Sequence, residues 1–452
     1  MNFTQTYAQP LKKIKLKRKK VKSESEIDYS ALDVNDDFRM VLNLVENTNK
    51  NLFITGKAGT GKSTLLKLIK ETTKKEIAVI APTGIAALNV KGQTIHSFFK
   101  FPLNLMTNEK IKKVRDTRMM DSLELLIIDE ISMVRADLMD AIDRSLRLNR
   151  RNDAPFGGVQ LILFGDMFQL PPVVKGKELE QYFDENFGGP YFFNSVVFDN
   201  CKLEVIELKK VYRQLNENFV NDLNRIREKR IDEQLLYRIN NTLCNNSKRD
   251  EPYVILTTTN MNANLINEYE LKKIQAEEYN YLATITGKFS EDAFPTEIQL
   301  KLKIGAQVIL TKNDRKRRWV NGTLAKITQL DKNTIGIRIN NKEYQLEMET
   351  WDNVEYQYDP ITSKIVEKVV GTFDQFPIRL AWALTIHKSQ GQTFDRAIID
   401  LSNGAFAHGQ TYVALSRCRN TEGIILTRPI TPADIIVDER VYDVYSMFDL
   451  IN

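Results

Sequence analysis

The chain has 452 residues, of which 42% are hydrophobic and 27% charged, and its formal net charge is +5. This length exceeds what one hydrophobic core usually supports, so we expect two or three domains. No apolar run approaches the length of a membrane span, and we expect no signal peptide. The three cysteines are scattered and form no CxxC pair, which argues against a disulfide framework or a zinc site and is typical of a reducing compartment.

A basic segment at residues 11–22 accounts for the positive net charge. It carries eight basic and no acidic residues, so the remainder of the chain has a net charge of −3. Any surface that binds nucleic acid must therefore be local. Dense like charges repel one another, and we expect residues 1–28 to be a disordered tail. Its role stays open between a nuclear localisation signal, a DNA-binding arm that ignores sequence, and a solubilising tail.

From about residue 29, short apolar strands alternate with helical stretches. Strands that are apolar on both faces are typical of a parallel sheet covered by helices on both sides; they are expected at 51–55, 77–81, 123–129, 159–165, 204–208 and 253–259. Between about 285 and 375, short segments of alternating polarity separated by turns predict an all-β insert. The sequence thus predicts an α/β fold with a first lobe at 29–200, a second lobe at 201–284 and 376–452, and a β insert at 285–375.

The segment GKAGTGKS, residues 56–63, follows the first strand and opens the helix STLLKLIKE. This is the strand, glycine-rich loop and helix of a phosphate-binding P-loop, whose backbone N–H groups surround phosphate oxygens. Lys62 is expected at the β- and γ-phosphates and Ser63 at Mg²⁺. The nucleotide-binding residues predicted here are Gly56, Lys57, Ala58, Gly59, Thr60, Gly61, Lys62, Ser63 and Thr64.

An acidic pair, Asp129 and Glu130, ends the apolar strand LLII about 70 residues later. Such a pair is often only the start of a loop. After a P-loop, however, it indicates a catalytic site, in which Asp129 would hold Mg²⁺ and Glu130 would polarise the attacking water.

The next strand ends in GDMFQLPPV, residues 165–173, where a polar Gln169 precedes two prolines. Side chains at the carboxyl edge of a parallel sheet can reach a nucleotide bound there. We therefore interpret Gln169 as a sensor of the γ-phosphate, and the prolines as a stiff connection that transmits its movement.

Taken together, these motifs resemble those of superfamily 1 DNA helicases, most closely the petite-integration-frequency helicases of the RecD-like 5′-to-3′ branch. The resemblance covers about residues 35–430 and rests on motifs in the order and spacing of that family: APTGIAAL (81–88), GQTIHSFF (92–99), DEISMV (129–134), GDMFQLPPV (165–173), VYRQ (211–214), AWALTIHKSQGQTF (381–394) and YVALSRCR (412–419). It implies two RecA-like lobes, a small wedge insert in the first lobe at about 97–116, and an SH3-like β-barrel insert in the second.

The resemblance also implies the roles of residues in the second lobe. Arg213 and Arg417 would be arginine fingers that offset charge on the γ-phosphoryl group, and Gly391 would join the nucleotide site. Single-stranded DNA would cross both lobes; its expected contacts are Thr83, Gly84, His96, Phe98, His387, Lys388, Ser389 and Gln390. For the phenylalanines of this motif, Phe98 and Phe99, packing in the core is the alternative to stacking on a base. For Phe99 the two interpretations are equally well supported.

Three features leave alternatives open. Residues 99–116 are expected to form either a hairpin that splits duplex or an ordinary surface loop. The loop at 313–322 places four basic residues beside Trp319 and would either touch DNA or be solvated. Relatives carry a glutamine before the first strand that reads adenine, whereas this chain has Asn35 and Asp36 there. Strict preference for ATP is therefore not implied.

The resulting hypothesis is a monomeric DNA helicase that uses ATP and Mg²⁺, translocates 5′-to-3′ and acts on single-stranded, forked or structured DNA in replication, repair or recombination. The alternatives are an ATP-driven remodeller of protein–DNA complexes without productive unwinding and a nucleic-acid-binding module with a vestigial ATPase. No membrane partner is expected. The expected location is the cytoplasm, at the nucleoid of a bacterium or in a viral setting, or the nucleus if the tail is a localisation signal.

Overall fold

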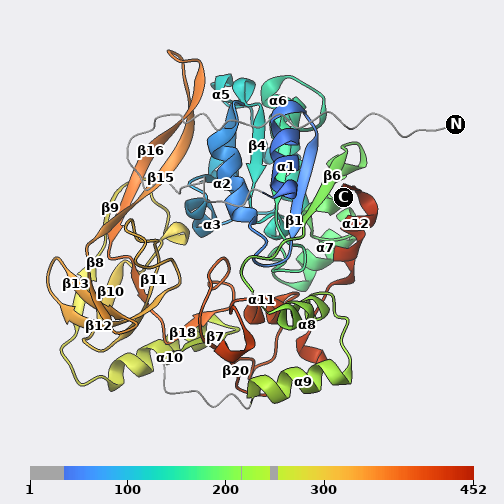
Figure 1. Ribbon diagram of the computed structural model, residues 1–452. Coiled ribbons are helices and arrows are strands. Elements are labelled where there is room, and N and C mark those ends of the chain that lie inside the picture. The colour runs from blue at the N-terminus through green and yellow to red at the C-terminus, as the bar shows by residue number, and fades with distance from the viewer. Residues whose placement is uncertain (1–34, 215, 245–252, 452) are drawn as a thin grey trace.

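A computed structural model describes residues 35–214, 216–244 and 253–451. The basic segment at 11–22 lies outside the described residues. The described chain forms two α/β lobes, one above the other in Figure 1, and a β-rich module beside them. This confirms the predicted fold class of two lobes with a β insert. No helix among the described residues has both the length and the apolar character needed to cross a membrane.

The first lobe is built on a seven-stranded parallel sheet of order β21-β6-β1-β5-β4-β2-β3. Its central strands are buried along their whole length, as their continuous apolar sequences predict. The strands are β1 (Asn51–Gly56), β2 (Ile77–Ala81), β3 (Gln93–Thr94), β4 (Leu125–Ile128), β5 (Gln160–Phe164), β6 (Leu203–Leu208) and β21 (Asp449–Ile451). The helices are α1 (Asp36–Asn47), α2 (Lys62–Thr72), α3 (Gly84–Asn89), α4 (Ile95–Phe99), α5 (Arg118–Ser122), α6 (Ala136–Arg150), α7 (Lys177–Phe187) and α12 (Asp443–Met447).

The second lobe has a four-stranded parallel sheet of order β18-β7-β19-β20. Its strands are β7 (Val254–Thr257), β18 (Ala383–Thr385), β19 (Ala397–Asp400) and β20 (Ile424–Leu426), and its helices are α8 (Glu217–Arg227), α9 (Glu233–Cys244), α10 (Asn260–Lys273) and α11 (Gln410–Leu415). The boundary expected at residue 200 does not separate the two sheets. Strands β6 and β21 lie after residue 200 in the chain, yet both belong to the first-lobe sheet. β6 pairs with β1 over all six residues, so its apolar side chains complete the first core.

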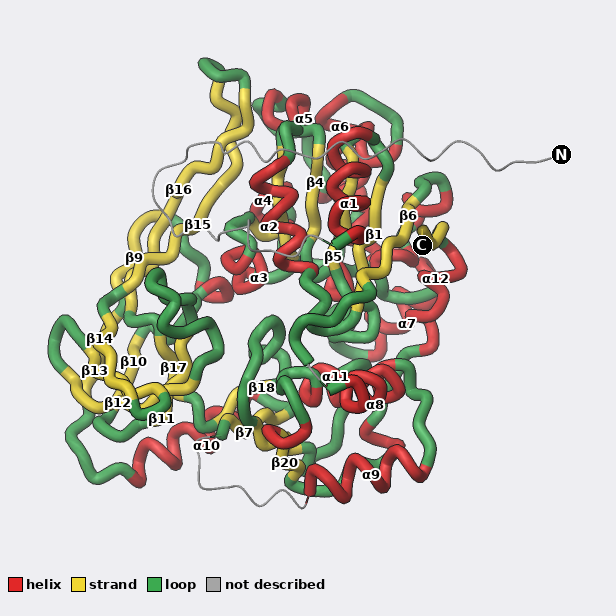
Figure 2. The backbone as a smooth tube through the Cα atoms, in the orientation of Figure 1, coloured by secondary structure: helices red, strands yellow, loops and turns green. Residues whose placement is uncertain are grey.

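The β module contains a five-stranded antiparallel sheet of order β14-β13-β12-β11-β17 and a two-stranded sheet. A long hairpin, β15 with β16, leaves the module and runs beside the first lobe toward α5 (Figures 1 and 2). The strands are β8 (Tyr279–Leu282), β9 (Thr284–Gly287), β10 (Gln299–Leu302), β11 (Gln307–Leu310), β12 (Leu324–Leu330), β13 (Ile335–Ile339), β14 (Lys342–Leu346), β15 (Glu349–Asp359), β16 (Lys364–Gln375) and β17 (Ile378–Leu380). Trp319 packs into this module's core, and Arg318 covers its ring at 4.3 Å while pairing with Asp314.

The hairpin expected at residues 99–116 is wrong. Residues 100–117, all described, contain no strand and one short 3₁₀ turn. Phe101 stacks on Phe99 at 5.2 Å, and the Met106 amide donates to the Asp137 carboxylate on α6. This segment therefore packs onto the first lobe through buried apolar side chains, Phe101 and Met106. Its sequence alone did not show whether these side chains belong to a strand or to a loop.

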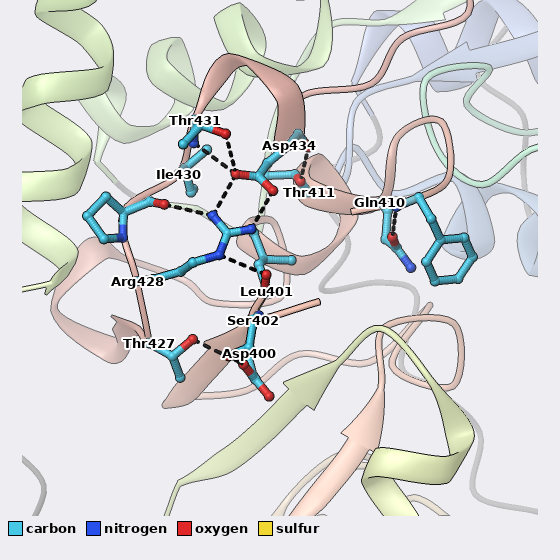
Figure 3. Close-up of polar contacts among 12 residues, drawn as sticks. Asp400, Leu401, Ser402, Gln410, Thr411, Thr427, Arg428, Ile430, Thr431 and Asp434 are labelled. Atoms are coloured by element: carbon cyan, nitrogen blue, oxygen red, sulfur yellow. Dashed lines mark hydrogen bonds and ion pairs between the residues drawn. The ribbon is translucent and has the colours of Figure 1, made fainter. Parts of the chain in front are cut away.

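Helix α11 brings the second lobe against the first. Below it, Arg428 makes two hydrogen bonds to Asp434, and the Thr411 hydroxyl donates to the Asp434 carbonyl (Figure 3). At its start, Gly409 has φ +70°, and a Cβ there would lie 2.3 Å from the backbone oxygen of Phe168. Only glycine allows the two backbones to approach this closely.

Gly409→Ala should lower the free energy of unfolding by about 2–5 kcal/mol. The left-handed backbone costs an L-residue roughly 1–2 kcal/mol, and moving the neighbouring backbone adds about 1–3 kcal/mol. The measurement is the urea midpoint. Gly404→Ala is a matched control, because Gly404 has φ +74° and nothing within 4 Å of a Cβ. Equal losses in the two variants would show that the contact with Phe168 is unimportant.

Candidate active site between the two lobes

A cavity of about 420 Å³ lies where the two lobes meet. Its first-lobe wall is the P-loop with the ends of β4 and β5, and its second-lobe wall comes from the segments that follow β6, β18 and α11. The lining residues are Ala58, Gly59, Thr60, Gly61, Lys62, Ser63, Thr64, Asp129, Glu130, Gly165, Gln169, Tyr212, Arg213, Gly391, Thr393, Arg417 and Arg419. All six residues predicted to be catalytic are in this set.

The P-loop has the geometry of an anion cradle. Gly61 has φ +88° and caps the N-terminus of α2, so the free N–H groups of the first helical turn face the cavity. Lys62 Nζ donates to the backbone oxygens of Gly56 at 2.5 Å and of Lys57 at 3.1 Å. Burial lowers the pKa of this lysine. A polyphosphate would give the ammonium group the counter-charge that backbone oxygens do not supply.

The two carboxylates at the end of β4 are adjacent and half-buried, and both line the cavity. Asp129 Oδ1 accepts a hydrogen bond from the Glu130 amide at 2.9 Å. Burial raises the pKa of Asp129 to about 6. Burial, followed by the charge of Asp129, raises the pKa of Glu130 to about 7. A carboxylate with a pKa near neutrality is suited to exchange protons with water.

The donor set suits Mg²⁺ bound together with phosphates. Ser63 is exposed at the start of α2, and Asp129 lines the same cavity as a second oxygen donor. The described residues contain no cluster of three or more His, Cys, Asp or Glu side chains that could enclose a metal. Mg²⁺ usually takes one or two protein oxygens and completes its shell with water and phosphate, so these residues fit it.

Two arginines bring positive charge to the second-lobe wall. Arg213 Nη1 donates to the Ser416 carbonyl at 3.3 Å, and Arg417 Nε donates to the Val413 carbonyl at 2.9 Å. Within the described residues, neither guanidinium forms an ion pair with a carboxylate. Burial, followed by the charge of Arg213, lowers the pKa of Arg417 to about 9. Both arginines would be stabilised by an anion in the cavity.

Three residues predicted to contact DNA lie elsewhere. Gln390 Nε2 donates to Glu130 at 3.0 Å and to Gln169 at 3.4 Å, which places it at the nucleotide site. Ser389 is fully buried, and its carbonyl accepts from Arg417. Phe98 is 4% exposed and packs edge-on against Phe99 and Tyr356, so its ring is closed to a base in this conformation. The sequence motifs alone did not show whether these three side chains point toward the nucleotide site, the core or the surface.

Four of the other five predicted DNA contacts lie nearer the surface. Lys388 is exposed and His387 and His96 are half-buried, while the Thr83 hydroxyl caps α3. Gly84 is covered by the β module, since a Cβ there would lie 2.5 Å from the Cα of Ala293. A DNA strand could therefore contact Gly84 only if the module moved away.

At the position expected to read adenine, the polar side chains are already engaged. Asn35 accepts from the Phe38 amide and caps α1, and Asp36 pairs with Arg39. Three residues that were not predicted from the sequence also line the cavity: Tyr212, Thr393 and Arg419. Tyr212 and Arg419 each lie within two positions of a predicted arginine finger, which was the available signal. Arg227, which pairs with Asp166 behind the cavity lining, was not predicted either, because it belongs to none of the motifs.

Comparisons with known proteins identify the family of this chain. Residues 33–250 match the model of the PIF1-like helicase family, and residues 291–330 match that of the DNA helicase Pif1 2B domain. The ATP-dependent DNA helicase Pif1 of Bdellovibrio bacteriovorus is 32% identical over 418 residues, which cover 89% of each chain. The chain belongs to the PIF1-like helicase family. The zebrafish (Danio rerio) PIF1 helicase is 35% identical over 85% of this chain, which spans 59% of that relative's length.

Crystal structures of Bacteroides sp. Pif1 show the same fold. The unliganded structure is 40% identical, covers 92% of this PIF1-like chain and 97% of its own, and superposes with a TM-score of 0.84. The TM-score falls to 0.66 for the same protein bound to single-stranded DNA. The complex of that protein with ADP-AlF4, whose name mentions no DNA, also superposes with a TM-score of 0.84, so the arrangement described for this chain is closer to the structures without DNA.

Proposed function

We propose that this chain is an ATP- and Mg²⁺-dependent DNA helicase that translocates 5′-to-3′ on single-stranded DNA and unwinds duplex or structured DNA, in replication, repair or recombination. The observation that carries this proposal is the cavity in which the phosphate cradle of one lobe faces Arg213 and Arg417 of the other. Release of the cleaved γ-phosphate after hydrolysis removes negative charge from between these walls, so each turnover would open and close the lobes.

Each polar group has a proposed role in hydrolysis. Lys62 and the P-loop amides bind the β- and γ-phosphates, and Ser63 with Asp129 holds Mg²⁺, which offsets phosphate charge. Glu130 accepts a proton from the attacking water, and Gln390 orients Glu130 through their hydrogen bond. Arg213 and Arg417 offset charge on the γ-phosphoryl group.

The proposed DNA path crosses Thr83, Gly84 and His96 on the first lobe and His387 and Lys388 on the second. A structure of Bacteroides Pif1 bound to single-stranded DNA and a structure of Pif1 helicases at forked double-stranded DNA support this partner class. That fork structure is described with two coordinating helicases. We propose that this chain is a monomer in the absence of a fork, which light scattering during gel filtration can check. We also propose that it acts in the compartment that holds the cell's DNA.

Unwinding of tailed duplexes tests the proposal. With ATP and Mg²⁺, a duplex carrying a 5′ single-stranded tail should be separated and one carrying a 3′ tail should not. Hydrolysis that rises with single-stranded DNA but separates neither substrate would instead support the remodeller of protein–DNA complexes. Hydrolysis that does not respond to DNA would contradict a motor.

Gln169→Ala should reduce DNA-stimulated hydrolysis about 100-fold, because losing one oriented polar group at a transition state typically costs that much. Nucleotide should still bind through the P-loop. The effect of a non-hydrolysable ATP analogue on single-strand affinity should shrink toward zero, since the two sites are coupled through one closing motion. Gln181→Ala, on the exposed face of α7, is the control. An unchanged analogue effect would make Gln169 a simple turn residue.

A further inference from the structure

The carboxylate of Asp166 joins the two lobes directly beside Gln169. Asp166 follows β5 in the first lobe and is 1% exposed. Its Oδ1 accepts from Arg227 Nη2 at 2.8 Å and from Arg227 Nε at 3.2 Å. Its Oδ2 accepts from Gln169 Nε2 at 3.2 Å and from the Tyr412 hydroxyl at 3.4 Å. Two second-lobe side chains thus hold the residue that holds the sensor glutamine.

Tyr412 extends this network to the P-loop. Its hydroxyl oxygen accepts from the Ala58 amide at 2.9 Å while its proton is directed to Asp166. Hydrogen bonds therefore connect a P-loop amide, the second lobe and Gln169 without a gap. Relative movement of the lobes has to stretch or break one of these bonds.

Arg227 is placed for orientation more than for stability. It is 2% exposed and lies 4.1 Å from the centre of the Phe168 ring. Burying such an ion pair is costly and is often no more stabilising than apolar packing. Burial alone would raise the pKa of Asp166, but the charges of Arg227 and Lys62 hold it below its usual value. Asp166 therefore stays ionised and can only accept hydrogen bonds.

An ionised acceptor determines which end of the Gln169 amide faces the nucleotide. The carboxylate requires the amino group, Nε2, so the carbonyl oxygen, Oε1, must point the other way. Oε1 indeed faces Gln390 Nε2, at 3.4 Å, beside Glu130 in the cavity. A carbonyl oxygen cannot donate to phosphate, but it can accept a hydrogen bond from water.

We propose that Asp166, fixed by Arg227 and Tyr412 of the second lobe, is a positioning residue that turns the Gln169 carbonyl oxygen toward the attacking water. The proposal rests on the proposed ATPase function and specifies what Gln169 does there: it orients water, as a glutamine does in other P-loop enzymes. Opening of the lobes withdraws Arg227 and Tyr412 and releases the orientation, which ties hydrolysis to the closed state.

A double-mutant cycle tests whether Asp166 acts through Gln169. Asp166→Asn should lower kcat for ATP about 10- to 100-fold with KM changed less than about threefold, because the asparagine amide can turn and also donate to Gln169. In the Gln169→Ala background the same substitution should change kcat less than about twofold. Tyr412→Phe should behave alike with a smaller loss. Additive losses in the cycle would overturn the proposal.

Asp137→Asn is the matched control. Asp137 is also buried, pairs with Arg135 at 2.8 Å and lies on α6, outside the cavity lining. Its substitution should lower stability without changing kcat of the folded enzyme by more than about twofold. A loss of kcat as large as that of Asp166→Asn would show a general effect of removing a buried carboxylate and would contradict the proposal.

A second readout needs no turnover. The side-chain amide protons of Gln169, assigned by their loss from the NMR spectrum of Gln169→Ala, should exchange slowly with water in the native protein and at least 10-fold faster in Asp166→Asn. Equal exchange rates would overturn the proposal. If the native protein shows protected protons but no DNA-dependent ATPase, the proposed function fails while the positioning of Gln169 by Asp166 stands.

Discussion

Lys62→Ala is expected to reduce ATP hydrolysis to the background level, a loss of at least about 1,000-fold, while single-strand affinity without nucleotide changes less than about twofold. The ammonium group reaches the cavity from the first turn of α2, where it would meet the β- and γ-phosphates. The proposed DNA path uses other segments, so binding of a single strand does not depend on this charge.

Steady-state phosphate release and fluorescence anisotropy of a labelled oligonucleotide measure the two quantities. Lys74→Ala is a suitable control, because it removes an exposed lysine just after the same helix. A large loss of DNA affinity in Lys62→Ala without nucleotide would contradict this separation of roles.

Arg213→Ala should lower DNA-stimulated kcat by roughly 1,000-fold or more, as removal of an arginine finger does in other phosphoryl-transfer enzymes. Arg213→Lys should recover little of this loss, since an ammonium group cannot donate in the planar two-pronged geometry of a guanidinium. Within the described part of the chain, the one hydrogen bond of this side chain is to the Ser416 carbonyl at 3.3 Å, so the fold should survive. Single-turnover hydrolysis measures the chemical step directly.

Arg225→Ala provides the control for charge removal in the second lobe. Arg225 pairs with Asp232 at the surface and does not line the cavity. If Arg213→Ala weakens nucleotide binding but leaves kcat unchanged, Arg213 binds the ground state and is not a finger.

Some of the site followed from short stretches of sequence. The P-loop was predictable because its glycines, lysine and serine lie within one segment of eight residues, and their chemistry depends on local backbone geometry. The acidic pair after β4 was predictable because a strand that ends at the carboxyl edge of a parallel sheet delivers its next residues there. The placement of Arg213 and Arg417 in the cavity followed only from the resemblance.

Other assignments depended on contacts between distant segments. Phe98 and Gln390 stand in motifs expected to meet DNA, yet one is packed under Tyr356 and the other bonds Glu130, 260 residues away in the chain. β6 joins the first sheet although the chain around it leads into the second lobe.

The sequence by itself therefore determined the chemistry of this protein: a P-loop nucleotide site in a two-lobed α/β fold with a β insert. The spacing of residues along the chain suffices to predict the P-loop, since the backbone N–H groups and side chains that bind phosphate all come from one short segment. Only the tertiary structure decided which side chains meet across the lobes, including the pairing of Asp166 with Arg227. Burial of that pair depends on contact between the two lobes, and no stretch of sequence around either residue predicts it.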